Sequence, residues 1–251
     1  MTLVDIEDRT TWPEDLTSLV SNATSSLDIN VRAFGDLVSE GDLDYYEDAL
    51  RDALKGRKLR AYHATRLLDH EVEAIRENGL RVLSRELLRS RADQAYEHGH
   101  IDAEARRALH DSTQFDQGHE LLDLSPRVCL ALTQFPFRVP HSLYEQLNNW
   151  GGEAQYDTPA WRETADEQVR HLGHPAIVVL NIDASDASVA RMAGIGLVHL
   201  FVGAHLRLTD IGKYMHYCAS IPGSDVEEIW QPGTHHYDQF PGLPGHESSA
   251  A

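Results

Sequence analysis

The chain has few of the residues that build disulfides or zinc sites. Of its 251 residues only two are cysteines, Cys129 and Cys218, and both lie in apolar stretches far apart in the sequence. Because no Cys-x-x-Cys pair occurs, a cysteine-based zinc site is not indicated. We therefore expect two buried free thiols and no disulfide.

A metal centre built from histidine is not indicated either. Fifteen histidines are present, but those in the middle of the chain lack acidic neighbours at the spacing that metal ligation needs. The sequence therefore predicts no metal site. These mid-chain histidines are His98, His100, His110 and His119.

Long apolar runs are missing as well. A bilayer-spanning helix needs about 18 or more consecutive apolar residues, and no such run occurs. The N-terminal sequence MTLVDIEDRTTWPED is acidic, whereas a secretory signal is basic and then apolar. We expect a cytoplasmic protein that does not contact membranes.

The common phosphate-binding motifs are absent. No Gly-x-Gly-x-x-Gly follows an apolar strand pattern, and no Gly-Lys-Ser or Gly-Lys-Thr loop occurs. These motifs place a diphosphate or triphosphate at a helix N-terminus. A doubly wound dinucleotide-binding fold and a phosphate-loop enzyme are therefore disfavoured.

Positive charge is also scarce. The chain has 22 Lys and Arg against 40 Asp and Glu, a net charge of -18, which disfavours nonspecific nucleic-acid binding. Basic residues gather in two short stretches, which could surround an anionic ligand or could be ordinary solvated surface. They are Lys55, Arg57, Lys58 and Arg60, and then Arg81, Arg85, Arg89 and Arg91.

What the chain does contain is a globular pattern of helices and strands. With 41% hydrophobic residues it can bury a core. Residues 1–56 read as an acidic helical segment, and further helices are expected after residue 85. The expected helices cover 12–20, 27–37, 42–54, 101–109, 140–149 and 161–172; the expected strands cover 125–133, 174–182, 197–202, 214–221 and 226–230.

The segment from Leu59 to Ser84 predicts a strand, a short turn and a capped helix. The strand carries Tyr62-His63-Ala64-Thr65, with His63 expected at its end and sharing one face with Thr65. Asp69 is the expected N-cap of the helix, and Asn78-Gly79 is typical of a helix end, with Leu80 as its hydrophobic contact.

This segment resembles the first motif of ADP-ribosyltransferases of the diphtheria-toxin and poly-ADP-ribose-polymerase branch. In that branch Tyr-His-Gly-Thr or Trp-His-Gly-Ser is followed by a helix and then by Gly-Leu or Gly-Ile. The match covers residues 59–84 closely and the remainder loosely. Ala64 departs from the pattern, because the family usually has glycine where the backbone meets nicotinamide.

A second stretch, Trp150-Gly151-Gly152-Glu153-Ala154-Gln155-Tyr156, also suits a ligand. Two glycines let a ligand approach the backbone closely, between an aromatic ring and a carboxylate. The alternative is a glycine-rich turn in which Trp150 packs in the core.

The resemblance implies a role for each of these residues. His63 would bind a ribose hydroxyl, Thr65 would support the turn, and Tyr62, Ala64 and Trp150 would contact NAD. Tyr144 or Tyr156 would stack on nicotinamide. A glutamate would stabilise the cationic transition state: Glu153 is preferred for its local setting, whereas Glu227 or Glu228 would match the late position usual in the branch.

The resemblance also implies the fold and the activity. The fold would be α+β, with a split, mainly antiparallel sheet around an NAD cleft. Residues 57–240 would form the catalytic domain, after the helical segment 1–56 and before a flexible tail, 241–251. The protein would use NAD as substrate and transfer ADP-ribose to a protein or nucleic acid.

Other activities remain open. Such a transferase could be a bacterial toxin or defence effector, and an inhibitory protein partner would then fit the acidic N-terminal helices. The alternatives are an NAD glycohydrolase, a tRNA 2′-phosphotransferase-like enzyme, for which the chain offers only part of the arginine-rich site, and a non-catalytic protein-binding module on the same fold.

Overall fold

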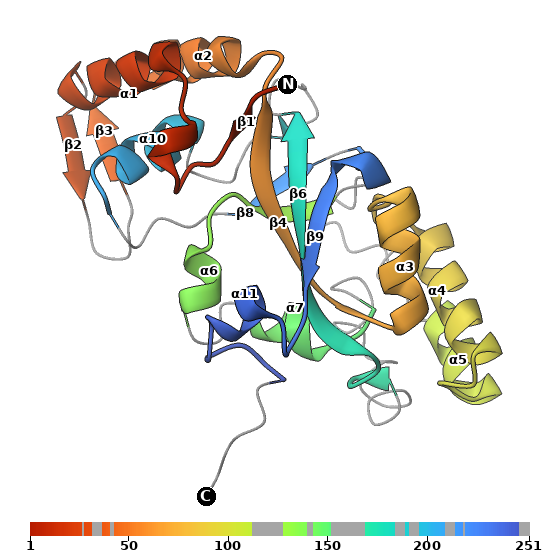
Figure 1. Ribbon diagram of the computed structural model, residues 1–251. Coiled ribbons are helices and arrows are strands. Elements are labelled where there is room, and N and C mark those ends of the chain that lie inside the picture. The colour runs from red at the N-terminus through yellow and green to blue at the C-terminus, as the bar shows by residue number, and fades with distance from the viewer. Residues whose placement is uncertain are drawn as a thin grey trace, which may run out of the picture. The chain divides into compact units, whose positions relative to one another are not determined.

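The computed structural model shows an α+β protein (Figure 1), as the sequence predicts. Two compact units are built from interleaved parts of the chain. Unit 1 comprises Met1–Tyr62, Cys129–Arg138 and Val179–Tyr217, and unit 2 comprises His63–Val128, Val139–Val178 and Cys218–Ala251. The structure describes residues 1–26, 28–31, 37–40, 43–111, 128–139, 143–151, 169–183, 189–190, 196–208, 214–217 and 219–245.

One sheet supplies strands to both units. Its order is β7-β8-β5-β4-β6-β9, and β1 pairs in addition with the start of β4. The sheet is mixed, since β1 runs parallel to β4 whereas β5 runs antiparallel to it. The strands are β1 (Leu3–Val4), β4 (Lys58–Leu67), β5 (Val128–Ala131), β6 (His174–Asp183), β7 (Val189–Ala190), β8 (Tyr214–Tyr217) and β9 (Val226–Trp230).

Unit 1 is built around three mutually packed helices, α1 (Glu14–Ser26), α2 (Leu43–Leu54) and α10 (Leu197–His205). The first two match the predicted helices. A short 3-10 helix, η1 (Arg9–Thr11), precedes α1, and Trp12 packs edge-on against Phe201 of α10 with ring centroids 5.1 Å apart. Unit 1 also includes α6 (Phe135–Arg138).

Two predictions in unit 1 are wrong. The helix predicted over 27–37 is replaced by two antiparallel strands, β2 (Asp28–Val31) and β3 (Leu37–Glu40), consistent with the β-branched residues in β2. The strand predicted over 197–202 is helix α10, whose residues from Leu197 to Gly203 are all buried. A short run that is apolar except for His199 has no periodicity that could separate a buried helix from a buried strand.

The start of α10 shows what favours the helix. Gly196 is the N-cap, and the Glu47 carboxylate of α2 accepts a hydrogen bond of 3.0 Å from the Val198 N–H. An added Cβ at Gly196 would overlap the Glu47 carboxylate. The helix N-terminus is thus satisfied by a side chain from a distant segment.

Unit 2 contains α3 (Asp69–Asn78), α4 (Arg85–Glu97) and α5 (Ala103–Asp111), of which α4 and α5 pack against each other. Their apolar core includes Leu68, Ala92, Ala95, Ile101, Ala105, Leu109, Trp150 and Val169. Shorter elements are α7 (Tyr144–Asn148), η5 (Gly223–Asp225) and α11 (His235–Asp238).

Helix α3 ends as the sequence predicts and begins differently. Gly79 has φ +83°, and a Cβ there would lie 1.8 Å from the Ile221 carbonyl oxygen, so only glycine fits without strain. Leu80 and Ile221 exchange two backbone hydrogen bonds of 2.8 Å. Asp69 is the first helical residue rather than the N-cap; the preceding N–H, that of Leu68, donates to the Glu71 carboxylate.

No helix within the described ranges has the length and apolar character needed to cross a membrane.

Candidate functional site

The motif Tyr62-His63-Ala64-Thr65 lies in the middle of β4, an inner strand flanked by β5 and β6. His63 is therefore not at the strand end, as the sequence predicted. Residues 63–66 are all half-exposed, whereas residues 61, 62 and 67 are buried. Because successive side chains of a strand alternate between faces, both faces of the sheet are partly accessible over these four residues.

Tyr62 belongs to the covered half of the strand. Its side chain is 1% exposed and packs edge-on against Phe137 of α6, with ring centroids 5.5 Å apart. Its hydroxyl accepts a hydrogen bond of 3.1 Å from Gln134 Nε2, and burial raises the pKa of the phenol. Tyr62 thus fills a core position on the face opposite His63. Its ring is buried, so it is not exposed for the contact with NAD that the resemblance implies.

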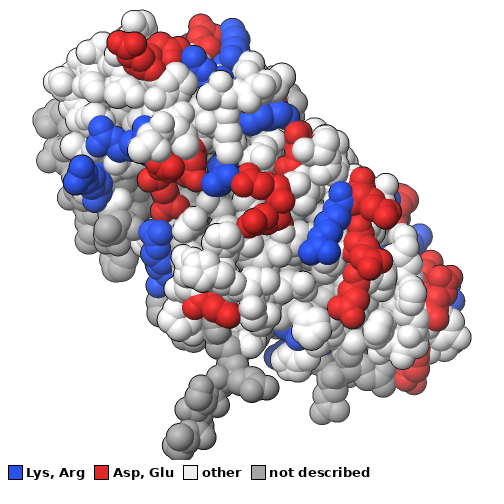
Figure 2. Space-filling model, viewed as in Figure 1, with Lys and Arg blue, Asp and Glu red and all other residues white. Residues whose placement is uncertain are grey.

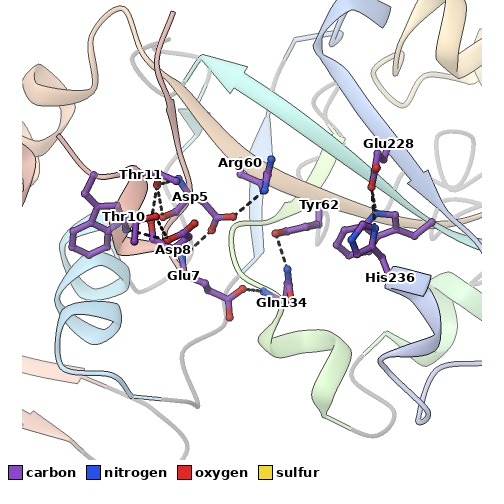
Figure 3. Close-up of polar contacts among 12 residues, drawn as sticks. Asp5, Glu7, Asp8, Thr10, Thr11, Arg60, Tyr62, Gln134, Glu228 and His236 are labelled. Carbon is purple, nitrogen blue, oxygen red and sulfur yellow. Dashed lines mark hydrogen bonds and ion pairs between the residues drawn. The ribbon is translucent and has the colours of Figure 1, made fainter. Parts of the chain in front are cut away.

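The turn that carries Gln134 is held from the N-terminal segment (Figure 3). The Glu7 carboxylate accepts from the Gln134 N–H at 2.6 Å. It also pairs with Arg138 at 3.2 Å. Burial raises the pKa of Glu7, although these two donors oppose the shift. Nearby, Asp5 pairs with Arg60 of β4 at 3.3 Å. A local window of sequence does not reveal this network, because its members are separated by up to 131 positions.

Arg66, at the exposed end of the motif, binds three backbone carbonyls in unit 2. Its guanidinium donates to Leu147 at 3.2 Å, to His171 at 2.8 Å and to Leu172 at 2.7 Å. Burial lowers the pKa of Arg66. The chain on either side of residues 152–168 is thus fixed to β4 by one side chain, which lies on the face opposite His63.

Trp150 is fully buried, with its indole N–H donating to Glu71 Oε2 at 2.9 Å. Arg91 of α4 pairs with the same carboxylate at 2.5 Å, and its guanidinium lies over the indole ring, 4.8 Å from the centroid. Burial alone would raise the pKa of Glu71, but Arg91, the Leu68 N–H and the Trp150 N–H together lower it. Trp150 therefore packs in the core, as the alternative interpretation of its stretch held.

The remaining expected site residues are placed unequally. Ala64 and Thr65 are half-exposed in β4, and Tyr144 begins α7. Glu153 and Tyr156 lie outside the described residues. His63, Ala64 and Thr65 therefore lie next to one another on one strand. The structure does not test Glu153 or Tyr156.

The late glutamates lie on β9, and both are exposed. Glu228 accepts a hydrogen bond of 2.7 Å from Trp230 Nε1 and pairs with His236 Nδ1 at 3.1 Å (Figure 3). Since two donors already orient the Glu228 carboxylate, it is less available than an unrestrained carboxylate to act on a substrate cation.

Four of the eight basic residues flanking the motif pair with carboxylates. Pairs form between Arg57 and Asp15, between Arg60 and Asp5, and between Arg91 and Glu71, and Lys55 pairs with Asp52. On the face shown in Figure 2, basic and acidic side chains are interspersed rather than gathered into one basic surface. The local field for an anion is therefore weaker than the residue types alone indicate.

No three histidine, cysteine or acidic side chains are arranged to hold a metal ion in the part of the chain that the structure describes.

Comparisons with known proteins find no match, whether with family models, curated proteins or solved structures.

Proposed function

We propose that the protein is an NAD-dependent ADP-ribosyltransferase that acts in the cytoplasm. The observation that carries the proposal is the segment 59–84, whose sequence resembles the first transferase motif and whose strand is partly accessible at residues 63–66. The helix that follows and the close approach at Gly79 have the order of elements that the motif implies.

The reaction breaks the bond between nicotinamide and ribose through an oxocarbenium-like transition state. The enzyme must fix the ribose and place negative charge beside the developing cation. We assign the first task to the His63 imidazole, through a hydrogen bond to a ribose hydroxyl, and the second to the Glu153 carboxylate. Ala64 and Thr65 would contact NAD from β4, and the ring of Tyr144 or Tyr156 would stack on nicotinamide.

Glu153 is preferred to Glu228 because of what Glu228 contacts. The Glu228 carboxylate is occupied by Trp230 and His236. Glu227 is adjacent in β9 and therefore faces the other side of the strand. The acceptor of ADP-ribose is a protein or a nucleic acid, and an inhibitory protein partner is part of the same proposal.

Incubation of the purified chain with NAD labelled in its adenylate part separates the candidate functions. Label on a macromolecule supports the transferase. Free ADP-ribose without labelled acceptor supports the alternative, an NAD glycohydrolase. No consumption of NAD in the presence of cell extract would contradict both and leave the non-catalytic module.

The variant His63→Ala tests the assigned site. We expect it to lower NAD turnover by at least tenfold while the melting temperature stays near that of the wild type, because His63 is half-exposed and outside the core. The matched control is His174→Ala, an exposed histidine at the start of β6, which should leave turnover unchanged. If His63→Ala turned over NAD at the wild-type rate, the motif could not be part of the active site.

A further inference from the structure

Three histidine rings meet in unit 2 between α3 and the turn that ends α4. The His70 ring stacks on the His98 ring, with centroids 4.4 Å apart and planes 14° apart. The His100 ring lies 6.3 Å from His70 and 6.2 Å from His98. We call these three residues the histidine cluster. His70 is half-buried, whereas His98 and His100 are exposed.

The turn that carries two of these rings has a fixed backbone. His98 is the C-cap of α4, and Gly99 follows with φ +75°. The Gly99 N–H donates to Tyr96 and the His100 N–H donates to Ala95, both at 2.9 Å. This is the pair of hydrogen bonds that defines a Schellman motif. The turn therefore presents His98 and His100 to α3 in a defined position.

The stacked arrangement does not suit a metal ion. The lone pair of an imidazole nitrogen lies in the plane of its ring, and the planes of His70 and His98 are nearly parallel. Their lone pairs therefore cannot converge on one ion unless a ring turns out of the stack. His70 Nε2 is buried and has no hydrogen-bond partner within the described structure, which also disfavours a charged ring at that position.

The charged groups around His70 do not compensate added positive charge. Glu71 and Arg91 face it from α3 and α4, and His98 and His100 face it from the turn. Glu71 is already paired with Arg91. Burial lowers the pKa of His70; His98, His100 and Arg91 lower it further, and Glu71 opposes them. A second proton in the cluster would therefore place like charges side by side, and Glu71, the carboxylate that acts on His70, is already paired.

We propose that the histidine cluster is a pH-sensitive contact between α3 and the α4 turn. At neutral pH the uncharged rings stack and hold the turn against α3. As the pH falls, protons that enter the cluster place like charges side by side, so the rings repel each other and separate. The contact is therefore present above the ordinary histidine pKa and is lost as the pH falls through the lowered pKa of His70.

Hydrogen exchange of the amides in residues 69–72 and 94–102 tests this. Opening constants, corrected for the intrinsic exchange rate, are compared at pH 7.5 and pH 5.5. We expect the wild-type opening constant to rise about tenfold as the pH falls, because the open state binds protons more readily than the closed one. His98→Phe keeps an aromatic ring that cannot be protonated, so its rise should be less than about threefold.

Control variants make the result specific. His174→Phe removes a histidine outside the cluster and should behave as the wild type does. His100→Phe repeats the test at the other exposed ring, should His98→Phe fail to fold. The same rise in the wild type and in His98→Phe, or no rise in the wild type, would overturn the proposal. Strong protection of the turn by Zn²⁺ at pH 7.5 would also overturn it and would identify a metal site instead.

Discussion

The Glu71 carboxylate accepts hydrogen bonds from donors in three segments of the chain. It accepts from the Leu68 N–H, from Trp150 Nε1 and from two nitrogens of Arg91. Because the carboxylate is 7% exposed, removal of its charge leaves the Arg91 cation partly buried without an anion.

We expect Glu71→Gln to lower the free energy of unfolding by about 3–5 kcal/mol, the usual effect of breaking a buried ion pair. Chemical denaturation at pH 7 measures it. The matched control is Glu73→Gln on the exposed face of α3, which should stay within about 0.5 kcal/mol of the wild type. The lowered pKa of Glu71 means that its contribution is present above the ordinary glutamate pKa and is lost as the pH falls through the lowered value.

The contribution of Glu7 to stability should depend on pH in the opposite sense. Its pKa is raised by burial, so the folded state binds a proton more readily than the unfolded state. Protonation of Glu7 therefore contributes stability at low pH, which is lost as the pH rises through the raised pKa. Measured by urea denaturation between pH 4 and pH 7, the stability of the wild type relative to Glu7→Gln should increase as the pH is lowered. A constant difference over this range would contradict the raised pKa.

The proposed role of Glu153 gives a kinetic prediction. A carboxylate that acts on the developing cation contributes more in the transition state than in the ground state. Glu153→Gln should therefore lower kcat for NAD consumption by at least a hundredfold and leave KM within about threefold. If Glu153→Gln keeps its turnover and Glu227→Gln or Glu228→Gln loses it, the active-site glutamate lies on β9.

At the scale of single elements, the end of α3 shows how a turn and a distant segment depend on each other. Gly79 has a positive φ, and its backbone approaches Ile221 and Pro222 too closely for any side chain. Gly99 has a similar φ of +75° but nothing within 4 Å of an added Cβ. A substitution at Gly99 therefore measures the cost of the backbone conformation alone. A substitution at Gly79 measures that cost together with the cost of crowding.

We expect Gly99→Ala to cost on the order of 1 kcal/mol of stability, the effect of an unfavourable φ alone. Gly79→Ala should cost at least about 2 kcal/mol more, because the segment around Ile221 must move away. Thermal and chemical denaturation of both variants give the comparison. Equal destabilisation by the two variants would show that segment 221–223 can move away without lowering the free energy of unfolding.

Elements whose pattern is complete in the local sequence were predicted correctly. Helix α3 has an apolar stripe and a glycine end signal, and β6 is an apolar run bounded by His174-Pro175. The apolar run at 197–202 was assigned to the wrong class, because its helical state depends on packing against α1 and α2 and on the Glu47 carboxylate. Those partners are not visible in a local window of sequence.

The candidate site was predictable to the same limited extent. The strand that carries His63 follows from its own residues, and so does the glycine at the end of α3. The burial of Tyr62 and Trp150 does not, because their hydrogen-bond partners, Gln134 and Glu71, are 72 and 79 positions away. Local sequence shows that an aromatic residue is present but does not distinguish a core ring from one that stacks on a ligand.

At the scale of the whole molecule, the interleaved composition of unit 1 has a consequence for synthesis on the ribosome. Helices α1 and α2 leave the ribosome early, but α10, which packs against both, is made only after five of the seven described strands of the sheet. Until then the nascent chain exposes apolar faces that attract chaperones or other nascent chains. Ribosome-bound chains that stop before Leu197 should therefore be more sensitive to protease within residues 14–54 than chains that extend past His205.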